Sequence, residues 1–179
     1  MWRGYGGAVS DRPGALLFLD VDGPLIPFGG PQPHPVYQLT HRTGGNPLLA
    51  RINPAHGRRL LALSCQVVWA TTWGEDANQD IAPFLGLPAL PVVTWPQPSA
   101  AEEQDDERHG LHWKTRTLVS WAAGRPFAWA DDEITSADRT WTGICHPGPA
   151  LLHRIDPATG LTDADYLTLG GWLLTASAT

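Results

Sequence analysis

Three short apolar runs of the sequence are each followed by polar residues. In open parallel sheets, ligands bind outside the carboxyl ends of the strands. If the runs are neighbouring strands, the polar side chains that follow them meet in one crevice. Packing does not explain the acidic ones, because a buried carboxylate without a partner is costly. The polar residues are Asp20 with Asp22, Thr71 with Thr72, and Asp131 with Asp132.

The carboxylates indicate what chemistry this crevice performs. Oxygen ligands without His or Cys partners favour a hard cation, and Mg²⁺ fits best. Such an ion lets an anionic substrate approach an anionic nucleophile. A carboxylate nucleophile that forms an aspartyl-phosphate is one route of phosphoryl transfer, and the remaining catalysis is positioning and charge neutralisation. The sequence therefore predicts Mg²⁺ as a cofactor and a phosphorylated substrate.

Segments typical of strands and of helices alternate along the chain. Short apolar runs bounded by Gly, Pro or charged residues indicate buried strands, and an apolar stripe that follows Pro54 indicates a helix. The alternation predicts an α/β fold, a three-layer Rossmann-like domain with a mainly parallel sheet. The expected strands are residues 15–20, 66–71, 90–95, 127–130 and 151–155, and the expected helices are residues 55–64, 75–84, 114–123 and 164–174.

The beginning of the chain divides into an arm and a domain. Residues 1–14 are Gly-rich and are predicted to be a loose N-terminal arm, followed by a single domain over residues 15–179. Residues 26–53 leave the sheet beside Asp20 and Asp22, and they predict a flap next to the site. Within this flap, residues 36–39 and 48–52 are expected to pair as a hairpin.

Residues 96–110 are Pro-rich and then acidic. A run of charge is usually a solvated surface, so this segment is predicted to be a mobile solvated loop. The connections that follow the first two strands are long enough for a flap but too short for a separate cap domain. The site is therefore expected to be open, and an open site accepts a bulky or polymeric substrate.

Composition excludes several classes of protein. The chain has 179 residues, of which 42% are hydrophobic and 17% are charged, as is typical of soluble globular proteins. Its net charge of -6 provides no strong general binding to nucleic acid and no attraction to an anionic membrane. No run approaches the roughly 20 apolar residues of a membrane span. Two cysteines form neither a disulfide framework nor a zinc site, so we expect a reducing, cytoplasmic location.

Four segments resemble the motifs of the haloacid-dehalogenase-like hydrolase superfamily. LLFLDVDGPL is similar to the first motif, a strand followed by D-x-D-G, and VVWATT is similar to the second, a strand that ends in Thr or Ser. HWKT contains Lys114 as a candidate for the third-motif lysine, and FAWADDE is similar to the fourth motif, which ends in paired acids. The order and spacing of the four segments fit the superfamily, and the short connections indicate its capless type.

The resemblance implies a role for each acidic residue. Asp20 is the expected nucleophile and a Mg²⁺ ligand. Asp22 is expected to protonate the leaving group and then to activate water, while its backbone carbonyl binds the metal. Asp131 is expected to bind the metal directly or through water, with Asp132 beside it.

Other motif residues leave alternatives open. Thr71 is expected to bind the phosphoryl group because it directly follows the apolar run, but Thr72 could take this role or cap the next helix. Lys114 is expected to neutralise charge on the phospho-aspartate, and the alternative is an ordinary surface lysine. Trp73 is either a core residue or a platform for a base or sugar. Pro24 departs from the superfamily, which usually has Thr or Val there, and its effect on activity stays open.

A narrower resemblance concerns a branch of the superfamily found in Swiss Army Knife RNA repair proteins. TTW, Asn78, HWKT, WADDE and DPATGLT are similar to that branch. The leading expectation is a Mg²⁺-dependent phosphomonoesterase that acts through an aspartyl-phosphate. One alternative is a polynucleotide-end phosphatase in nucleic-acid repair, which the branch favours and the acidic net charge opposes. Another is a catalytically weak binding module on the same scaffold.

Overall fold

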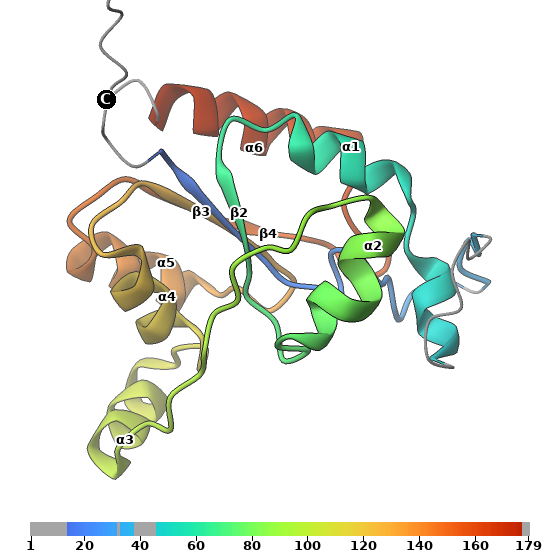
Figure 1. The fold of residues 1–179 in the computed structure, drawn as a ribbon. Helices are drawn as coiled ribbons and strands as arrows, with labels where there is room; N and C mark the ends of the chain where they lie inside the picture. The colour runs from blue at the N-terminus through green and yellow to red at the C-terminus, as the bar shows by residue number, and fades with distance from the viewer. Residues whose placement is uncertain (1–13, 32, 38–45, 177–179) are drawn as a thin grey trace, which may run out of the picture.

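Four parallel strands form one sheet at the centre of the molecule (Figure 1). The computed structural model describes residues 14–31, 33–37 and 46–176. In this part of the chain the strand order is β2–β1–β3–β4, which confirms the predicted α/β fold with a parallel sheet. The strands are β1 (Leu16–Leu19), β2 (Gln66–Trp69), β3 (Phe127–Asp131) and β4 (Ala150–Arg154).

Helices cover both faces of the sheet. α1, α2 and α6 lie on one face and α4 and α5 on the other, while α3 stands apart from both layers (Figure 1). Over the described residues no second folded unit covers the sheet, as predicted for a Rossmann-like domain without a separate cap. The helices are η1 (Pro47–Arg51), α1 (Ala55–Leu61), η2 (Ala77–Ile81), α2 (Ala82–Leu85), α3 (Ala100–His109), α4 (Thr115–Ala122), α5 (Ser136–Cys145) and α6 (Asp163–Ala176).

The strand β1 is central, since it pairs with β2 on one side and with β3 on the other. All four of its residues are buried. A strand that is buried on both faces must be an unbroken apolar run, and this requirement explains the sequence LLFL. Leu16 and Phe18 pack in the layer of α4, whereas Leu17 and Leu19 pack in the layer of α1, α2 and α6.

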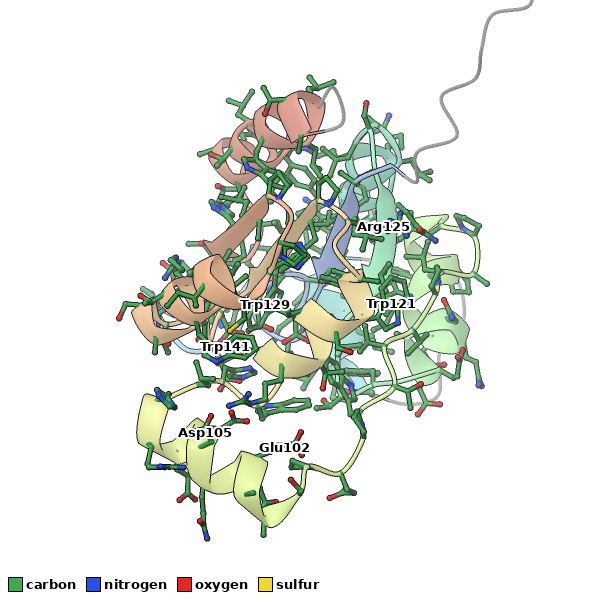
Figure 2. All side chains as sticks on the ribbon, turned by 90° about the vertical axis from the view of Figure 1, so that its left-hand side faces the viewer. Glu102, Asp105, Trp121, Arg125, Trp129 and Trp141 are labelled. Atoms are coloured by element: carbon green, nitrogen blue, oxygen red, sulfur yellow. The ribbon has the colours of Figure 1, made fainter. Side chains whose placement is uncertain are left out.

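Aromatic side chains fill the space between the sheet and α4. Phe18 contacts Trp121 of α4 edge to face, with ring centroids 5.5 Å apart, and contacts Phe127 of β3 at 5.4 Å. Trp129 lies in the same layer, on the β3 side of Trp121 (Figure 2). Each such pair adds about 0.5–1.5 kcal/mol to the effect of burial. The packing fixes α4 against the sheet, and with it the residue that directly precedes α4, Lys114.

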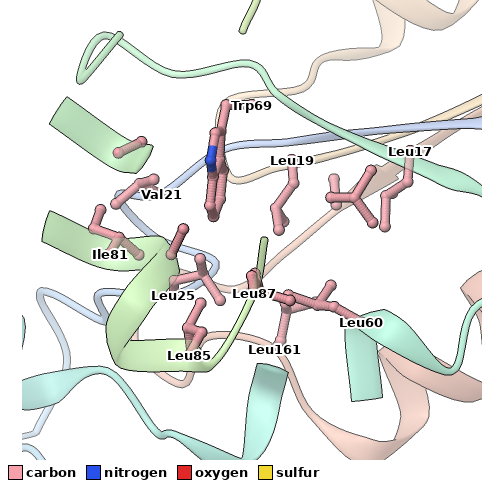
Figure 3. Packing of buried hydrophobic residues seen from close by; sticks show 14 of the residues in the cluster. Leu17, Leu19, Val21, Leu25, Leu60, Trp69, Ile81, Leu85, Leu87 and Leu161 are labelled. Carbon is pink, nitrogen blue, oxygen red and sulfur yellow. The ribbon is translucent and has the colours of Figure 1, made fainter. Parts of the chain in front are cut away.

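On the other face, aliphatic side chains surround Trp69 (Figure 3). Leu25 lies in this cluster together with Leu85 and Leu161. Leu25 belongs to the turn that follows Asp22, so the core anchors the loop that leaves the predicted catalytic residues. Within the described residues, each helix is too short or too polar to cross a bilayer.

The prediction of a mobile loop over residues 96–110 is wrong, because α3 forms there. The side chain of Ser99 accepts a hydrogen bond from the backbone N–H of Glu102, and Glu102 accepts one from the backbone N–H of Ser99. This capping box starts the helix, and Gly110, with φ of 63°, ends it in a left-handed conformation that glycine adopts easily. The helix buries none of its residues, so no apolar periodicity marked it in the sequence.

The predicted hairpin within the flap is also wrong where the structure describes it. Residues 47–51 form the short helix η1, which Asn46 caps by accepting a hydrogen bond from the backbone N–H of Leu48. Among the residues of these two runs that the structure describes, one backbone hydrogen bond joins them, from the Tyr37 N–H to the Ala50 carbonyl at 2.7 Å. Residues 38–45 and the arm before Gly14 lie outside the described residues, and the flap itself stays a prediction.

Residues 90–95 do not form the third strand that their apolar character predicts. They run beside β2 with one isolated bridge, Trp69 to Val92, because Pro91 has no N–H with which to extend a ladder. The side chain of Asn78 holds this segment instead. It accepts hydrogen bonds from Trp69 Nε1 at 3.0 Å and from the Leu90 N–H at 2.9 Å, and its amide donates to the Leu90 carbonyl at 2.9 Å.

We predict that acid destabilises the fold through His56 of α1. His56 is buried beside Tyr166 of α6, with Nδ1 3.0 Å from the hydroxyl, and burial, with Arg59 adding to it, lowers the pKa of His56 from 6.5 to about 4. The folded state then binds fewer protons than the unfolded state, so this stabilisation is complete above pH 6.5 and is lost as the pH falls towards 4. The loss is of the order of 3 kcal/mol.

The measurement is the free energy of unfolding of the natural chain and of His56→Gln by urea titration between pH 4 and pH 7. Glutamine remains neutral across this range. The free energy of unfolding of the natural chain should therefore fall relative to that of His56→Gln as the pH falls. A difference that is independent of pH would contradict the assignment.

Candidate active site

The ends of β1 and β3 bring two carboxylates together. Leu19 pairs with Ala130 in the parallel register, so Asp20 and Asp131, the next residues, stand side by side. The backbone N–H of Asp20 donates to the Ala130 carbonyl at 3.1 Å. Both aspartates are buried. The convergence predicted from the apolar runs is therefore present in the structure.

Lys114 bridges these two carboxylates. Its ammonium nitrogen lies 2.7 Å from Asp20 Oδ2 and 2.8 Å from Asp131 Oδ2. The side chain is 3% exposed, which excludes the alternative of an ordinary surface lysine. Burial alone lowers the pKa of Lys114, but Asp20 and Asp131 outweigh it and raise the pKa above its ordinary value, so this lysine stays charged.

Backbone and indole donors orient the same carboxylates. Asp20 Oδ1 accepts from the Val21 N–H at 2.8 Å, and Asp131 Oδ1 accepts from the Glu133 N–H at 2.9 Å. Trp129 Nε1 donates to Asp131 Oδ2 at 3.2 Å. Burial nevertheless raises the pKa of Asp20 to about 7, with Lys114 lowering it and Asp131 raising it further.

Asp132 is the third buried carboxylate of the site. Burial, followed by the charge of Asp131, raises the pKa of Asp132. Its side chain packs directly on Gly23 of the D-x-D-G segment, where a Cβ atom would lie 2.5 Å from Asp132 Oδ1. Gly23 also has φ of 84°. Glycine is thus required at this position of the first motif for two reasons: its backbone conformation and the close approach of Asp132.

Asp22 is held by a residue whose role the sequence left open. Trp73 Nε1 donates to Asp22 Oδ2 at 3.0 Å, and the backbone N–H of Trp73 donates to Thr71 Oγ1 at 3.3 Å. Trp73 therefore connects the second motif to the proposed acid/base. Thr71 is buried and Thr72 is exposed, and the following helical turn has Asp76 at its cap position, so Thr72 caps no helix.

Asp138 of α5 positions the loop that carries Lys114, although the sequence indicated neither Asp138 nor its helix. Asp138 Oδ1 accepts from the His112 N–H at 2.8 Å and from the Thr115 hydroxyl at 2.6 Å. Burial would raise the pKa of Asp138, but these bonds and those from Thr135 outweigh it, so the pKa is lowered. The capping box Thr135-x-x-Asp138 was the available signal.

The DPATGLT segment packs on the turn that follows Asp22. The backbone N–H of Leu161 donates to the Pro24 carbonyl at 2.9 Å, and the Phe28 N–H donates to the Pro157 carbonyl at 2.8 Å. Pro24 has no N–H group, but the turn needs no donor at this position. The N–H groups of Leu25 and Ile26 close the turn, and both donate to the Val21 carbonyl. This late segment therefore stabilises the first motif.

The donors present fit a magnesium ion. One oxygen atom from each of Asp20, Asp131 and Asp132 lies within 4.8 Å of the others, and an all-oxygen set suits Mg²⁺. Within the described part of the chain, Lys114 is the one cation that forms ion pairs with these carboxylates. Three carboxylates against one ammonium group leave the site with a negative charge overall. His112, Asp131 and Glu133 lie equally close together, but His112 Nε2 and Glu133 Oε2 already pair at 2.9 Å.

An acidic pair, a threonine, a lysine and a second acidic pair occur in this order at one edge of a parallel sheet, as in the phosphatase-type hydrolases of the haloacid-dehalogenase-like superfamily. The profile of the family described as "HAD domain in Swiss Army Knife RNA repair proteins" matches residues 16–166. Because the match covers most of the chain, the protein belongs to this family. A search of curated proteins and a search of solved structures gave no match.

We predict that Gly23→Ala disrupts the site through Asp132. The added Cβ displaces the Asp132 side chain, and the positive φ adds strain of about 1–3 kcal/mol. Gly86→Ala is the matched control, because Gly86 has a similar φ of 67° and open space around it. Thermal unfolding should show a loss of stability in both variants, whereas Mg²⁺ binding measured by calorimetry should weaken only in Gly23→Ala. Equal Mg²⁺ affinity in the two variants would contradict the role of this contact.

Proposed function

We propose that this chain is a Mg²⁺-dependent phosphomonoesterase that acts through an aspartyl-phosphate on Asp20. The observation that carries the proposal is the buried Asp20 carboxylate, which the Lys114 ammonium and the Asp131 carboxylate flank at the end of the sheet. Asp20, Asp131 and Asp132 would hold the ion, together with the backbone carbonyl of Asp22. When bound, Mg²⁺ supplies positive charge that offsets the phosphate and the carboxylates.

The proposed reaction has two steps on this chain's own residues. In the first step, an Asp20 carboxylate oxygen attacks phosphorus, the ester P–O bond breaks, and Asp22 gives its proton to the departing oxygen. In the second step, a water molecule attacks the phospho-aspartate and gives a proton to Asp22. The Asp20–phosphorus bond breaks, and inorganic phosphate leaves with both aspartates restored.

Three neighbouring residues are assigned to positioning and charge. Because the indole N–H of Trp73 donates to Asp22 Oδ2, the other carboxylate oxygen of Asp22 remains for proton transfer. Lys114 would neutralise the phospho-aspartate, and Thr71, buried beside Trp73, would donate its hydroxyl to the phosphoryl group.

A second candidate function is the removal of phosphate from polynucleotide ends. Two observations favour it: the family is described from RNA repair proteins, and the described residues place no folded cap over the site. The net charge of -6 opposes strong binding to long nucleic acids. A competition assay between RNA with a terminal phosphate and free nucleotides separates the two candidates.

We predict that Asp20→Asn and Asp22→Asn both abolish most turnover. Loss of the acid/base in Asp22→Asn should lower kcat by roughly 10²–10⁴-fold, and Asp20→Asn should be at least as damaging because no covalent intermediate forms. Asp76→Asn serves as the control, since Asp76 is exposed. The assay is hydrolysis of a generic phosphomonoester with and without Mg²⁺. A natural chain that turns over no phosphomonoester would instead favour the binding-module alternative.

We also predict that Mg²⁺ affinity depends on pH near neutrality. Since burial raises the pKa of Asp20 to about 7, protons compete with the metal below that pH. The apparent affinity should fall by about tenfold per pH unit below this value, as isothermal titration calorimetry can measure. Asp20→Asn should bind Mg²⁺ more weakly and with a shallower pH dependence. Affinity of the natural chain that does not change between about pH 6 and about pH 8, about one unit on each side of the pKa, would argue against metal binding at Asp20.

A further inference from the structure

A cavity of about 670 Å³ lies between α3 and the body of the protein. Figure 2 shows α3 separated from α4, with Glu102 and Asp105 on the side of α3 that faces the body. The residues that line it include Trp95, Trp113, Glu103, Glu107 and Arg116. The volume is within the range of about 300–1,000 Å³ that is typical of sites for small molecules.

Ion pairs, rather than apolar packing, hold α3 in place. Arg116 of α4 forms ion pairs with Asp105 and Asp106 of α3, and its guanidinium lies 4.9 Å from the ring centroid of Trp141. Since α3 buries no residue, the helix contributes no side chain to the core. Its visible effect on the molecule is to form one wall of the cavity.

Two indole rings connect the cavity to the candidate active site. Trp95 and Trp113 meet edge to face, with centroids 4.7 Å apart. Trp95 Nε1 donates to the Thr71 carbonyl at 3.0 Å, and the Trp113 centroid lies 5.5 Å from the Lys114 ammonium, which itself contacts Asp20. Trp113 lines the cavity and is thus the residue that links it to Lys114, its neighbour in the chain, which lies beside the proposed position of the phosphate.

The exposure of Trp113 is not explained by the fold. The residue is 47% exposed, whereas Trp69 and Trp129 are buried in the two cores. Large aromatic faces beside a site are suited to stacking, and a base stacked on an aromatic side chain contributes about 1–3 kcal/mol of binding free energy.

The charges on the cavity walls favour one chemical class of ligand. Among the described residues that line it, Arg116 is the only cation, and Asp105 and Asp106 already occupy it. Glu103 and Glu107 offer carboxylate acceptors. These walls repel phosphate but accept hydrogen bonds from the N–H groups of a flat heterocycle, so they favour the heterocycle of a phosphorylated ligand over its phosphate.

We propose that this cavity binds the nucleobase of the nucleotide whose phosphate lies at Asp20, with Trp113 as the stacking platform. The inference rests on the proposed function, because the proposed function places the phosphate at Asp20. The same base chemistry is available from a free nucleotide and from the last nucleotide of a strand.

The test compares substrates with and without a base in Trp113→Ala. With adenosine 5′-monophosphate, kcat/KM should fall by about tenfold, the loss expected when one stacked base is removed. With ribose 5-phosphate, which has the same sugar and phosphate but no base, kcat/KM should change by less than about twofold. Trp113→Phe should retain part of the preference for the nucleotide. Leu167→Ala is the control, because Leu167 is an exposed apolar residue on α6.

Equal losses on both substrates, or no loss on the nucleotide, would overturn the proposal. Two further substrates, an RNA oligonucleotide with a 5′-phosphate and one with a 3′-phosphate, tell whether the base belongs to a free nucleotide or to the end of a strand. The natural substrate should show the largest loss of kcat/KM in Trp113→Ala. If the natural chain hydrolyses no phosphomonoester, the proposed function fails while the cavity remains testable. Quenching of tryptophan fluorescence by adenosine should then occur in the natural chain and be weakened in Trp113→Ala, and its absence would reject the base site.

Discussion

One buried ammonium group, that of Lys114, connects three separate parts of the chain. It pairs with the carboxylate after β1 and with the one that ends β3, and it directly precedes α4. Removal of one partner from such a buried pair leaves an uncompensated charge and costs several kcal/mol. The arrangement requires the parallel pairing of β1 with β3, the aromatic packing under α4, and the hydrogen bonds from Asp138 to the loop before α4. Each of these features fixes the lysine relative to the strands.

The buried strands were the most predictable part of the fold. β1 and β3 are covered on both faces, so their sequences are unbroken apolar runs that end abruptly in acids. For the same reason the convergence of Asp20, Asp131 and Asp132 followed from the sequence. The helix α4 was predictable as well, because its apolar stripe packs on one layer of the core.

Other features depend on contacts that a single sequence does not reveal. The bond between Trp73 and Asp22 joins residues 51 positions apart, and nothing local in TTW distinguishes an indole donor from a core residue. Asp138 serves a loop 26 residues away in the same manner. The helix α3 lacks an apolar face, so no hydrophobic periodicity predicted it, and its run of charge led to the prediction of a solvated loop. Residues 90–95 have the composition of a strand. Pro91 cannot extend a ladder, however, and the hydrogen bonds of Asn78 hold the segment beside β2 without forming a strand.

The independence of α3 from the core has a consequence for how this scaffold diverges. Substitutions in α3 are free of the packing constraints that restrict β1 or α4, because none of its side chains is buried. It is attached by Arg116, so the helix can change in sequence while the catalytic carboxylates and the sheet remain as they are. Related domains are therefore expected to vary most at this wall, and exchange of α3 between them is a route to altered substrate preference without redesign of the fold.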